Sequence, residues 1–213
     1  MEQKPKYIRK LFSSWWLPKV YDLWVWVAVL GKTKNLRKNI LEFVPSNPGT
    51  IVDLATGTGE NAILLKRMFP EARVLASDLS EGMLGVAKEK AGKLGIEFSL
   101  QDAAKPSYAS CIADFVTISF ALHDLPGEKR EEVMKEALRI LKPGGTFAVY
   151  DYHLPSNLLV RIPLVVQFLL VENLDAWRML KEDLGNKLTE AGFHSTRKKT
   201  YYQGLAQIVA GEK

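Results

Sequence analysis

Apolar and polar positions alternate in two different ways along the central part of the chain. Short β-branched runs predict strands at about residues 50–54, 74–78, 96–100, 115–120 and 146–152. Between them, apolar residues recur at helical spacing, which predicts helices at about 60–69, 80–94 and 128–141. Ser80 is the expected N-cap of the second helix, and Pro143-Gly144-Gly145 is the expected stop of the third. This alternation predicts a parallel sheet with helices on both faces.

The alternation of strands and helices ends after the fifth strand. Residues 154–174 form an apolar insert, and a helix at about 176–191 follows it. Two further strands at about 193–202 and 205–210, joined through Gln203-Gly204, predict an antiparallel hairpin. The expected fold class is therefore α/β, with a seven-stranded, mostly parallel sheet that a C-terminal antiparallel hairpin completes.

Composition narrows the class of protein. The chain has 213 residues, of which 47% are hydrophobic and 25% charged, so it is an ordinary folded protein and not a disordered one. A single cysteine excludes a disulfide framework and a cysteine-based zinc site. The three histidines lie far apart in the sequence, so we expect no metal site. These features fit a reducing, cytoplasmic compartment.

The net charge of +5 is concentrated near the N-terminus. Residues 1–40 hold nine Lys/Arg and two acidic residues, a net +7, so the remaining 173 residues carry −2. The same stretch contains four of the five tryptophans, which are Trp15, Trp16, Trp24 and Trp26. We therefore expect a basic, Trp-rich N-terminal arm at 1–40 and a ligand-binding domain at 41–213.

The arm has three interpretations. Tryptophan rings beside basic residues suit an anionic membrane surface, which would make the protein peripheral on the inner membrane face. The arm can instead pack onto the domain as a lid. RNA binding is the third interpretation, and the slightly acidic body disfavours it, so nucleic acid is not an expected partner. The longest apolar run near the N-terminus, 23–30, has eight residues and is too short to span a bilayer.

Candidate chemistry lies at the ends of the first two strands. Gly57 and Gly59 follow the first strand and allow a tight turn with close backbone approach to a ligand. Asp78 ends the second strand, where a carboxylate can bind the ribose hydroxyls of a nucleoside. The loop also fits the G-x-G-x-x-A pattern of dinucleotide sites. However, Asp53 and Glu60 would repel a pyrophosphate, whereas the cationic S-adenosylmethionine (SAM) suits carboxylates.

Four segments, taken together and in this order, resemble a known family, the class I SAM-dependent methyltransferases. These segments are Asp53-Leu54-Ala55-Thr56-Gly57-Thr58-Gly59, Ala76-Ser77-Asp78-Leu79-Ser80-Glu81-Gly82-Met83-Leu84, Gln101-Asp102-Ala103 and Leu138-Arg139-Ile140-Leu141-Lys142-Pro143-Gly144-Gly145. The last of them, with Tyr21-Asp22 ahead of the domain, is similar to the ubiquinone/menaquinone biosynthesis branch, with which we group phospholipid N-methyltransferases of similar type. The resemblance covers about residue 18 to the C-terminus and implies a Rossmann-like fold.

The resemblance also implies a cofactor site for SAM and its product S-adenosylhomocysteine (SAH). Asp53 and the loop from Gly57 to Gly59 would hold the methionine part, and Asp78 would bind the ribose. The other implied contacts are Leu79 and Met83 beside the adenine, Asp102 at its amino group with Ala103 next to it, Ser119 and Phe120 on the sulfonium side, and Tyr21 closing over the cofactor. Ala55, Thr56, Thr58 and Gln101 complete the implied set.

The sequence departs from the quinone C-methyltransferases in two places. Where they resemble one another in Phe-Gly-Ile-Arg-Asn, this chain has Phe120-Ala121-Leu122-His123-Asp124. Where they usually carry Glu-Phe-Ser, it has Asp151-Tyr152-His153. These differences do not affect the prediction that the chain uses SAM as a methyl donor. However, a quinone substrate does not follow from the resemblance.

Candidate catalytic residues follow the fourth and fifth strands. Methyl transfer from a sulfonium depends mainly on alignment, and a base is needed only where the acceptor loses a proton. His123 and His153 can each serve as that base, because histidine titrates near neutrality, and Tyr152 is a secondary candidate. The alternatives are a loop residue bonded to Asp124 for His123 and a surface residue for His153. We expect His194 to be structural.

These features predict a SAM-dependent methyltransferase that acts on a small, lipophilic acceptor at or near the membrane. A phospholipid amine head group and a quinone precursor are the leading substrates, and the basic arm favours the first. The apolar insert would wall the substrate pocket or face the bilayer; a buried helix or a homodimer contact is the alternative. Two other functions stay open, an NAD-dependent oxidoreductase and a non-catalytic SAM-binding module for a membrane or partner.

Overall fold

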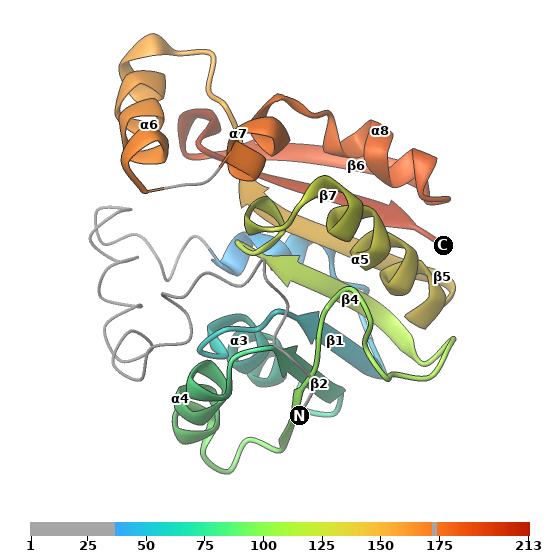
Figure 1. Cartoon of the computed structure of the whole chain (residues 1–213). Coiled ribbons are helices and arrows are strands. Elements are labelled where there is room, and N and C mark those ends of the chain that lie inside the picture. Colours follow the sequence, from blue (N-terminus) through green and yellow to red (C-terminus); the bar gives the residue numbers. More distant parts are fainter. Residues whose placement is uncertain (1–36, 172–173) are drawn as a thin grey trace.

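The computed structural model describes residues 37–171 and 174–213. Within them, seven strands form one sheet of order β3-β2-β1-β4-β5-β7-β6 (Figure 1). The strands are β1 (Thr50–Leu54), β2 (Arg73–Asp78), β3 (Ile96–Leu100), β4 (Ala113–Ser119), β5 (Leu141–Tyr152), β6 (His194–Tyr201) and β7 (Ala206–Glu212). Strands β1 to β5 pair in parallel, and β7 runs antiparallel to both β5 and β6. The predicted fold class and hairpin are confirmed.

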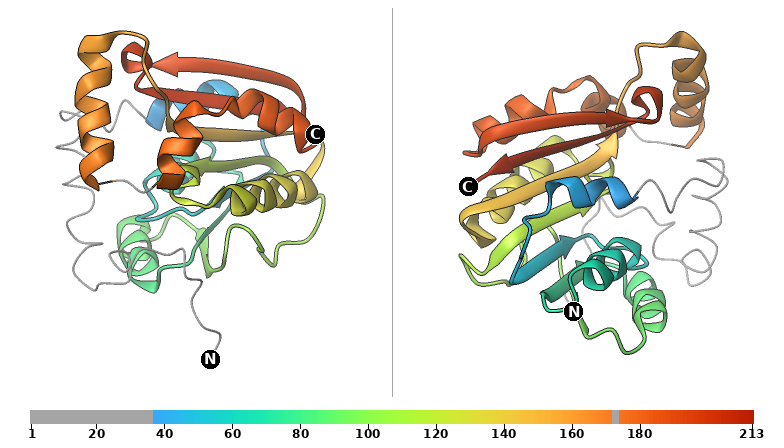
Figure 2. Two further views of the ribbon diagram at one scale, coloured as in Figure 1. Left: turned by 45° about the horizontal axis from the view of Figure 1, so that its top comes forward. Right: turned by 180° about the vertical axis from the view of Figure 1, so that it is seen from behind.

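Helices cover both faces of the sheet, as predicted. The helices are α3 (Glu60–Met68), α4 (Glu81–Ala91), α5 (Gly127–Ile140), α6 (Leu158–Val171), α7 (Leu174–Lys181) and α8 (Leu184–Glu190), with short 3-10 helices η2 (Asn39–Phe43), η3 (Leu122–Asp124) and η4 (Tyr202–Gly204). On β1, Val52 and Leu54 pack in a cluster with residues of α5 and α8, while Ile51 packs in a second cluster with η2 and α3. Figure 2 shows η2 lying across the face opposite α5. The alternation of side chains along each strand therefore builds two cores.

Two elements differ from the sequence prediction. The helix expected at 176–191 is two helices, because Asp183 interrupts it and caps the second, accepting a hydrogen bond from the N–H of Gly185 at 2.9 Å. The segment expected as a turn after α5 lies inside β5, where pairing with β4 shifts between Leu141 and Thr146. A side chain at Gly145 would lie 3.1 Å from the carbonyl oxygen of Ala113, so this bulge requires a glycine.

The sheet order places a topological switch point between β1 and β4. From β1 the chain proceeds to β2 and β3 on one side, and then returns to β4 and β5 on the other. In open α/β sheets, ligands bind at the carboxyl ends of the strands beside such a switch. The loops that follow β1 to β5 therefore define the candidate site.

The insert stands at the same end of the molecule. Figure 1 shows α6 on the side toward which the arrows of β4 and β5 point. The buried residues Leu164, Ala176 and Leu180 join α6 to α7, and Tyr152 at the end of β5 packs against them. No helix in the described part of the chain has the length and apolar character needed to cross a bilayer. Residues 1–36 of the predicted arm, with Tyr21 and the four tryptophans, lie outside the described residues.

Candidate active site

The loop between β1 and α3 has an unusual backbone. Ala55, Gly57 and Gly59 all have positive φ, at 50°, 58° and 80°. The N–H of Thr56 donates to the carbonyl of Ser77 at 2.8 Å, which ties the loop to the end of β2. Non-glycine residues with positive φ are uncommon and concentrate at functional sites. The loop therefore has the character of a ligand-binding turn.

The two glycines are required for different reasons. A Cβ on Gly59 would lie 2.8 Å from the Cβ of Ala87, so this glycine allows α3 and α4 to approach each other. A Cβ on Gly57 would meet nothing within 4 Å, so the open side of the loop is at Gly57. The sequence prediction assigned both glycines to the ligand. The structure adds a packing role for Gly59.

Asp53 lies buried at the end of β1, directly beneath the loop. Its carboxylate accepts hydrogen bonds from Thr56 Oγ1 at 2.5 Å and from Asn61 Nδ2 at 3.0 Å. Burial raises the pKa of Asp53 to about 6, although both hydrogen bonds act in the opposite direction. A buried carboxylate of this kind gains stability from a cationic neighbour, such as the ammonium group expected at this loop.

Asp78 connects the loop to the start of α4. Its carboxylate accepts hydrogen bonds from the N–H groups of Gly57 and Ser80, both at 2.8 Å, and burial raises its pKa. Ser80 caps α4 as predicted, accepting a hydrogen bond from the N–H of Met83 at 3.3 Å. Asp78 therefore also holds the glycine loop in place, a role that spacing alone did not indicate.

The residues after β3 have defined local roles. The side-chain oxygen of Gln101 accepts a hydrogen bond from the backbone N–H of Ser107 at 2.6 Å. The backbone N–H of Gln101 donates to the backbone carbonyl of Asp78 at 3.0 Å. Asp102 accepts a hydrogen bond from the N–H of Ala104 at 2.9 Å and so forms an Asx turn. Ala103 is buried beside it. This turn carries Asp102 to the carboxyl edge of the sheet.

The end of β4 is strained. Phe120 has a φ of 51° and donates its N–H to the carbonyl of Tyr150 at 2.7 Å. Its ring lies 4.8 Å from that of Tyr150 and 5.4 Å from that of Tyr152. Ser119 has a buried Oγ without a hydrogen-bond partner among the described residues. Both predicted residues therefore lie at the switch point, where strain is consistent with a functional position.

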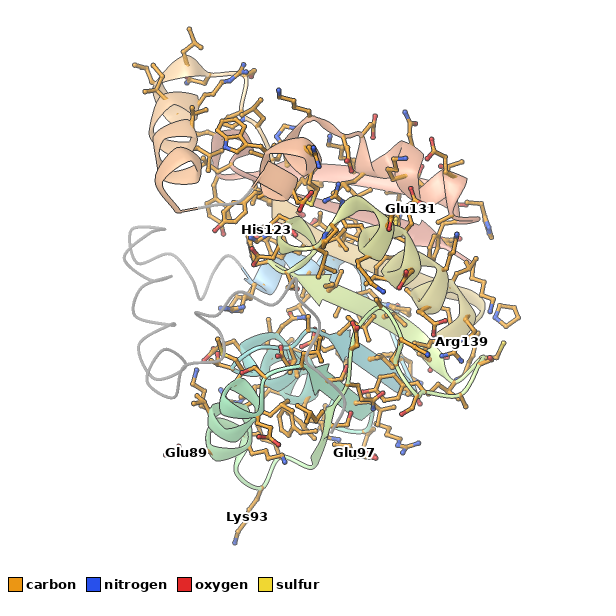
Figure 3. The ribbon with its side chains drawn as sticks, in the orientation of Figure 1. Glu89, Lys93, Glu97, His123, Glu131 and Arg139 are labelled. Carbon is orange, nitrogen blue, oxygen red and sulfur yellow. The ribbon has the colours of Figure 1, made fainter. Side chains whose placement is uncertain are left out.

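His123 is buried in η3, with only 4% of its surface exposed. Its Nδ1 lies 2.6 Å from Oδ1 of Asp151, and its Nε2 lies 3.6 Å from Oδ2 of Asp124. The Tyr152 ring is 4.9 Å away, so two of the three predicted catalytic residues lie together. Figure 3 shows His123 at the end of the molecule toward which β4 points, whereas Arg139 lies at the opposite end.

The other two histidines lie in different surroundings. His153 is half-buried, and its Nδ1 lies 2.8 Å from the carbonyl oxygen of Gly204 in η4. This bond joins the end of β5 to the turn of the hairpin. His194 is exposed at the start of β6. Asp151, the partner of His123, was absent from the predicted site residues; an aspartate in an otherwise apolar strand was the signal that could have indicated it.

Carboxylates collect along the carboxyl edge of the parallel strands. Each of β1 to β5 has an aspartate within its last two residues or in the loop that follows it: Asp53, Asp78, Asp102, Asp124 and Asp151. Glu60 of the loop is paired with Lys90 at 2.7 Å, so the sequence argument from an uncompensated Glu60 is wrong. The aspartates alone make the edge acidic. Such an edge concentrates cationic ligands and fits the ammonium and sulfonium groups of SAM better than a pyrophosphate.

Comparisons with known proteins point to one family of enzymes. Residues 51–145 match a family described as a methyltransferase domain. The chain is 32% identical to an uncharacterized methyltransferase from Synechocystis over 204 residues, which cover 93% of this chain and 94% of that protein. It is 26% identical over 238 residues to a ubiquinone/menaquinone biosynthesis C-methyltransferase from Geobacter sulfurreducens, covering 100% of this chain and 91% of that one.

Solved structures show the same fold. A SAM-dependent methyltransferase from Thermotoga maritima, described as a possible histamine N-methyltransferase, superposes with a TM-score of 0.71 at 18% identity, covering 95% of this chain and 99% of that chain. Phosphoethanolamine N-methyltransferase 2 from Haemonchus contortus, solved with SAM, superposes with a TM-score of 0.66 at 17% identity. That match covers 84% of this chain and 52% of the other.

Proposed function

We propose that this chain, which belongs to the class I SAM-dependent methyltransferases, methylates a small lipophilic acceptor at or near a membrane surface. Family membership makes SAM the methyl donor and SAH the product, so the dinucleotide alternative is set aside. The described residues that would hold the cofactor are those of the sequence prediction: Asp53, Ala55, Thr56, Gly57, Thr58, Gly59, Asp78, Leu79, Met83, Gln101, Asp102, Ala103, Ser119 and Phe120. Tyr21 would close over the cofactor from the arm.

The observation that carries this proposal is the apolar insert beside His123. Leu158, Leu159 and Ile162 at the start of α6 are 65%, 83% and 58% exposed. The insert packs against Tyr152, whose ring lies 4.9 Å from His123. Clustered exposed leucines are unusual on a soluble surface and are typical of sites that bind apolar ligands or membranes. The insert thus offers a lipophilic acceptor a surface that leads to the catalytic residues.

A phospholipid amine head group is the first acceptor class. Asp124 and Asp151 lie on the β4–β5 side of the switch point and favour an acceptor that arrives as a cation. A quinone precursor is the second class, supported by the quinone-biosynthesis names among the relatives. The amine requires proton removal before it attacks the methyl carbon, and His123 is positioned at the end of β4 for this step.

The test is a label-transfer assay with methyl-labelled SAM. The purified full chain is incubated with vesicles of phosphatidylcholine that contain either phosphatidylethanolamine or a reduced demethylated quinone, and the products are extracted into organic solvent. Label in the amine lipid supports the first class, and label in the quinone supports the second. With a total cell extract as the acceptor source, label that stays entirely in the aqueous phase would show that the acceptor is not lipophilic. Boiled enzyme and Asp78→Ala, which should lose cofactor binding, are the controls.

A further inference from the structure

We infer that Asp151 is a positioning residue for methyl transfer, whose buried carboxylate holds the His123 imidazole as the Nδ1–H tautomer and makes Nε2 the proton acceptor. The inference rests on the proposed function, because it names a residue that the proton-transfer step needs. It goes further by assigning a task to a side chain whose hydrogen bonds, among the described residues, are to His123 and Tyr152.

The carboxylate of Asp151 is engaged on both oxygens. Oδ1 accepts from Nδ1 of His123 at 2.6 Å and from the N–H of Tyr152 at 2.8 Å, and Oδ2 accepts from the backbone N–H of His123 at 3.1 Å. Asp151 is 0% exposed, so these contacts are shielded from water. Two of the three donors are backbone groups, which fix the carboxylate relative to the ring that it orients.

This arrangement determines the ring tautomer. A carboxylate that accepts hydrogen bonds on both oxygens has no partner for a proton of its own, so the hydrogen between it and the ring belongs to Nδ1. In a neutral imidazole, one nitrogen carries the hydrogen and the other carries the lone pair. Nε2 of His123 is therefore the basic nitrogen. The same orientation of histidine by a buried aspartate activates nucleophiles in hydrolases.

A second carboxylate lies near the other side of the ring. Oδ2 of Asp124 is 3.6 Å from Nε2, which is too long for a hydrogen bond but close enough for a favourable charge interaction. Asp124 therefore stabilises the imidazolium that forms when Nε2 takes a proton. The aromatic ring of Tyr152 contacts the imidazole as well, which limits its rotation.

The chemical step balances with these groups. The acceptor nitrogen, as an ammonium, first loses one proton to Nε2 of His123, and its lone pair then forms the bond to the methyl carbon. The S–CH3 bond breaks, and its electron pair stays on sulfur as the neutral thioether of SAH. Asp151 donates and accepts no proton in this sequence; it keeps the ring in the orientation and tautomer that the first step requires.

The first experiment reads the tautomer directly and needs no substrate. Ring-nitrogen NMR of the 15N-labelled full chain is recorded at alkaline pH, and the signals are assigned with the variants His153→Gln and His194→Gln, because the chain has three histidines. The expected result is an Nδ1–H tautomer for His123. An Nε2–H tautomer, or a ring that stays doubly protonated, would overturn the inference.

The second experiment compares Asp151→Asn with Asp124→Asn, a matched change in the other carboxylate beside the same ring. The amide that Asp151→Asn introduces has a single acceptor oxygen, so it cannot accept from both Nδ1–H and the backbone N–H of His123, and it lacks the negative charge that stabilises the imidazolium. We expect kcat for label transfer to fall about 10²- to 10⁴-fold, with little change in KM, since this is the range for comparable changes. Asp124→Asn should lower kcat about tenfold or less.

The outcomes separate this inference from the proposed function. Tm and SAH affinity are measured for both variants; SAH affinity should stay close to that of the wild type, and Tm should fall by a few degrees in Asp151→Asn, because one buried N–H loses its acceptor. Equal losses in kcat for the two variants, or an unchanged kcat in Asp151→Asn, would overturn the positioning role while leaving the function intact. Failure of the wild type to label any lipophilic acceptor would refute the proposed function, and the NMR result would still decide the tautomer. If Asp151→Asn does not fold, the wild-type spectrum remains decisive.

Discussion

Asp53→Asn removes a carboxylate that the fold buries completely at the end of β1. Among the described residues its hydrogen-bond donors are Thr56 Oγ1 and Asn61 Nδ2, and the Arg37 charge also favours the ionised form, but burial outweighs all three. An asparagine has nearly the same shape and can keep a hydrogen bond to each partner. The substitution therefore tests whether the buried charge at this position destabilises the fold in exchange for binding a cationic ligand.

The magnitude follows from the pKa of Asp53, which burial raises from an ordinary value of 3.8 to about 6. Because the folded state holds this proton more tightly, the contribution of Asp53 to stability is most favourable below pH 3.8 and is lost as the pH rises through about 6. At about 1.4 kcal/mol for each pH unit, the loss is about 3 kcal/mol at neutral pH. Asp53→Asn should recover most of it, raising Tm by about 5 to 10 °C at pH 7.5 and by little at pH 4.

The assay is thermal unfolding followed by circular dichroism between pH 4 and pH 8, without cofactor. Calorimetry with SAH completes it, because the same variant should bind SAH more weakly. In the wild type, SAH affinity should fall as the pH drops through about 6, when the carboxylate gains a proton. A variant that is less stable than the wild type by the same amount at every pH would refute the reasoning, because the buried charge would then not be the source of the cost.

Two other predictions concern groups outside this carboxylate. The Lys142 ammonium and two backbone N–H donors lower the pKa of Asp114 by more than burial raises it, so the pKa lies below its usual range. Asp114→Asn should therefore destabilise the protein by about 1 to 2 kcal/mol at pH 7, and the difference should disappear as the wild-type carboxyl gains its proton below pH 3.8, which the same thermal scans would show. Gly59→Ala places a Cβ 2.8 Å from that of Ala87 and should cost about 3 kcal/mol in urea unfolding, whereas Gly57→Ala meets no atom within 4 Å and should cost about 1 kcal/mol. Equal costs would contradict the separate roles of the two glycines.

Local patterns in the sequence were sufficient for the fold class and for the loop after β1. Strand and helix periodicity, the N-cap Ser80 and the turn at Gln203-Gly204 each depend on residues close to one another in the chain, and all three are confirmed. The prediction of a single helix at 176–191 was wrong, because apolar spacing carries no information about an N-cap inside the segment. Asp183 accepts hydrogen bonds from the first N–H groups of α8 and so starts a new helix.

Only the tertiary structure decided how the distant residues combine. Sequence spacing treated His123 and His153 alike, but the pairing of β4 with β5 brings Asp151 to one of them, 28 positions away, and leaves the other bound to the hairpin turn. Long-range packing also places Gly59 against Ala87 of α4 and pairs Glu60 with Lys90. Periodicity and caps are local interactions that the chain encodes directly, whereas the partner of a buried polar group depends on which strands lie side by side, and that is fixed only when the whole sheet assembles.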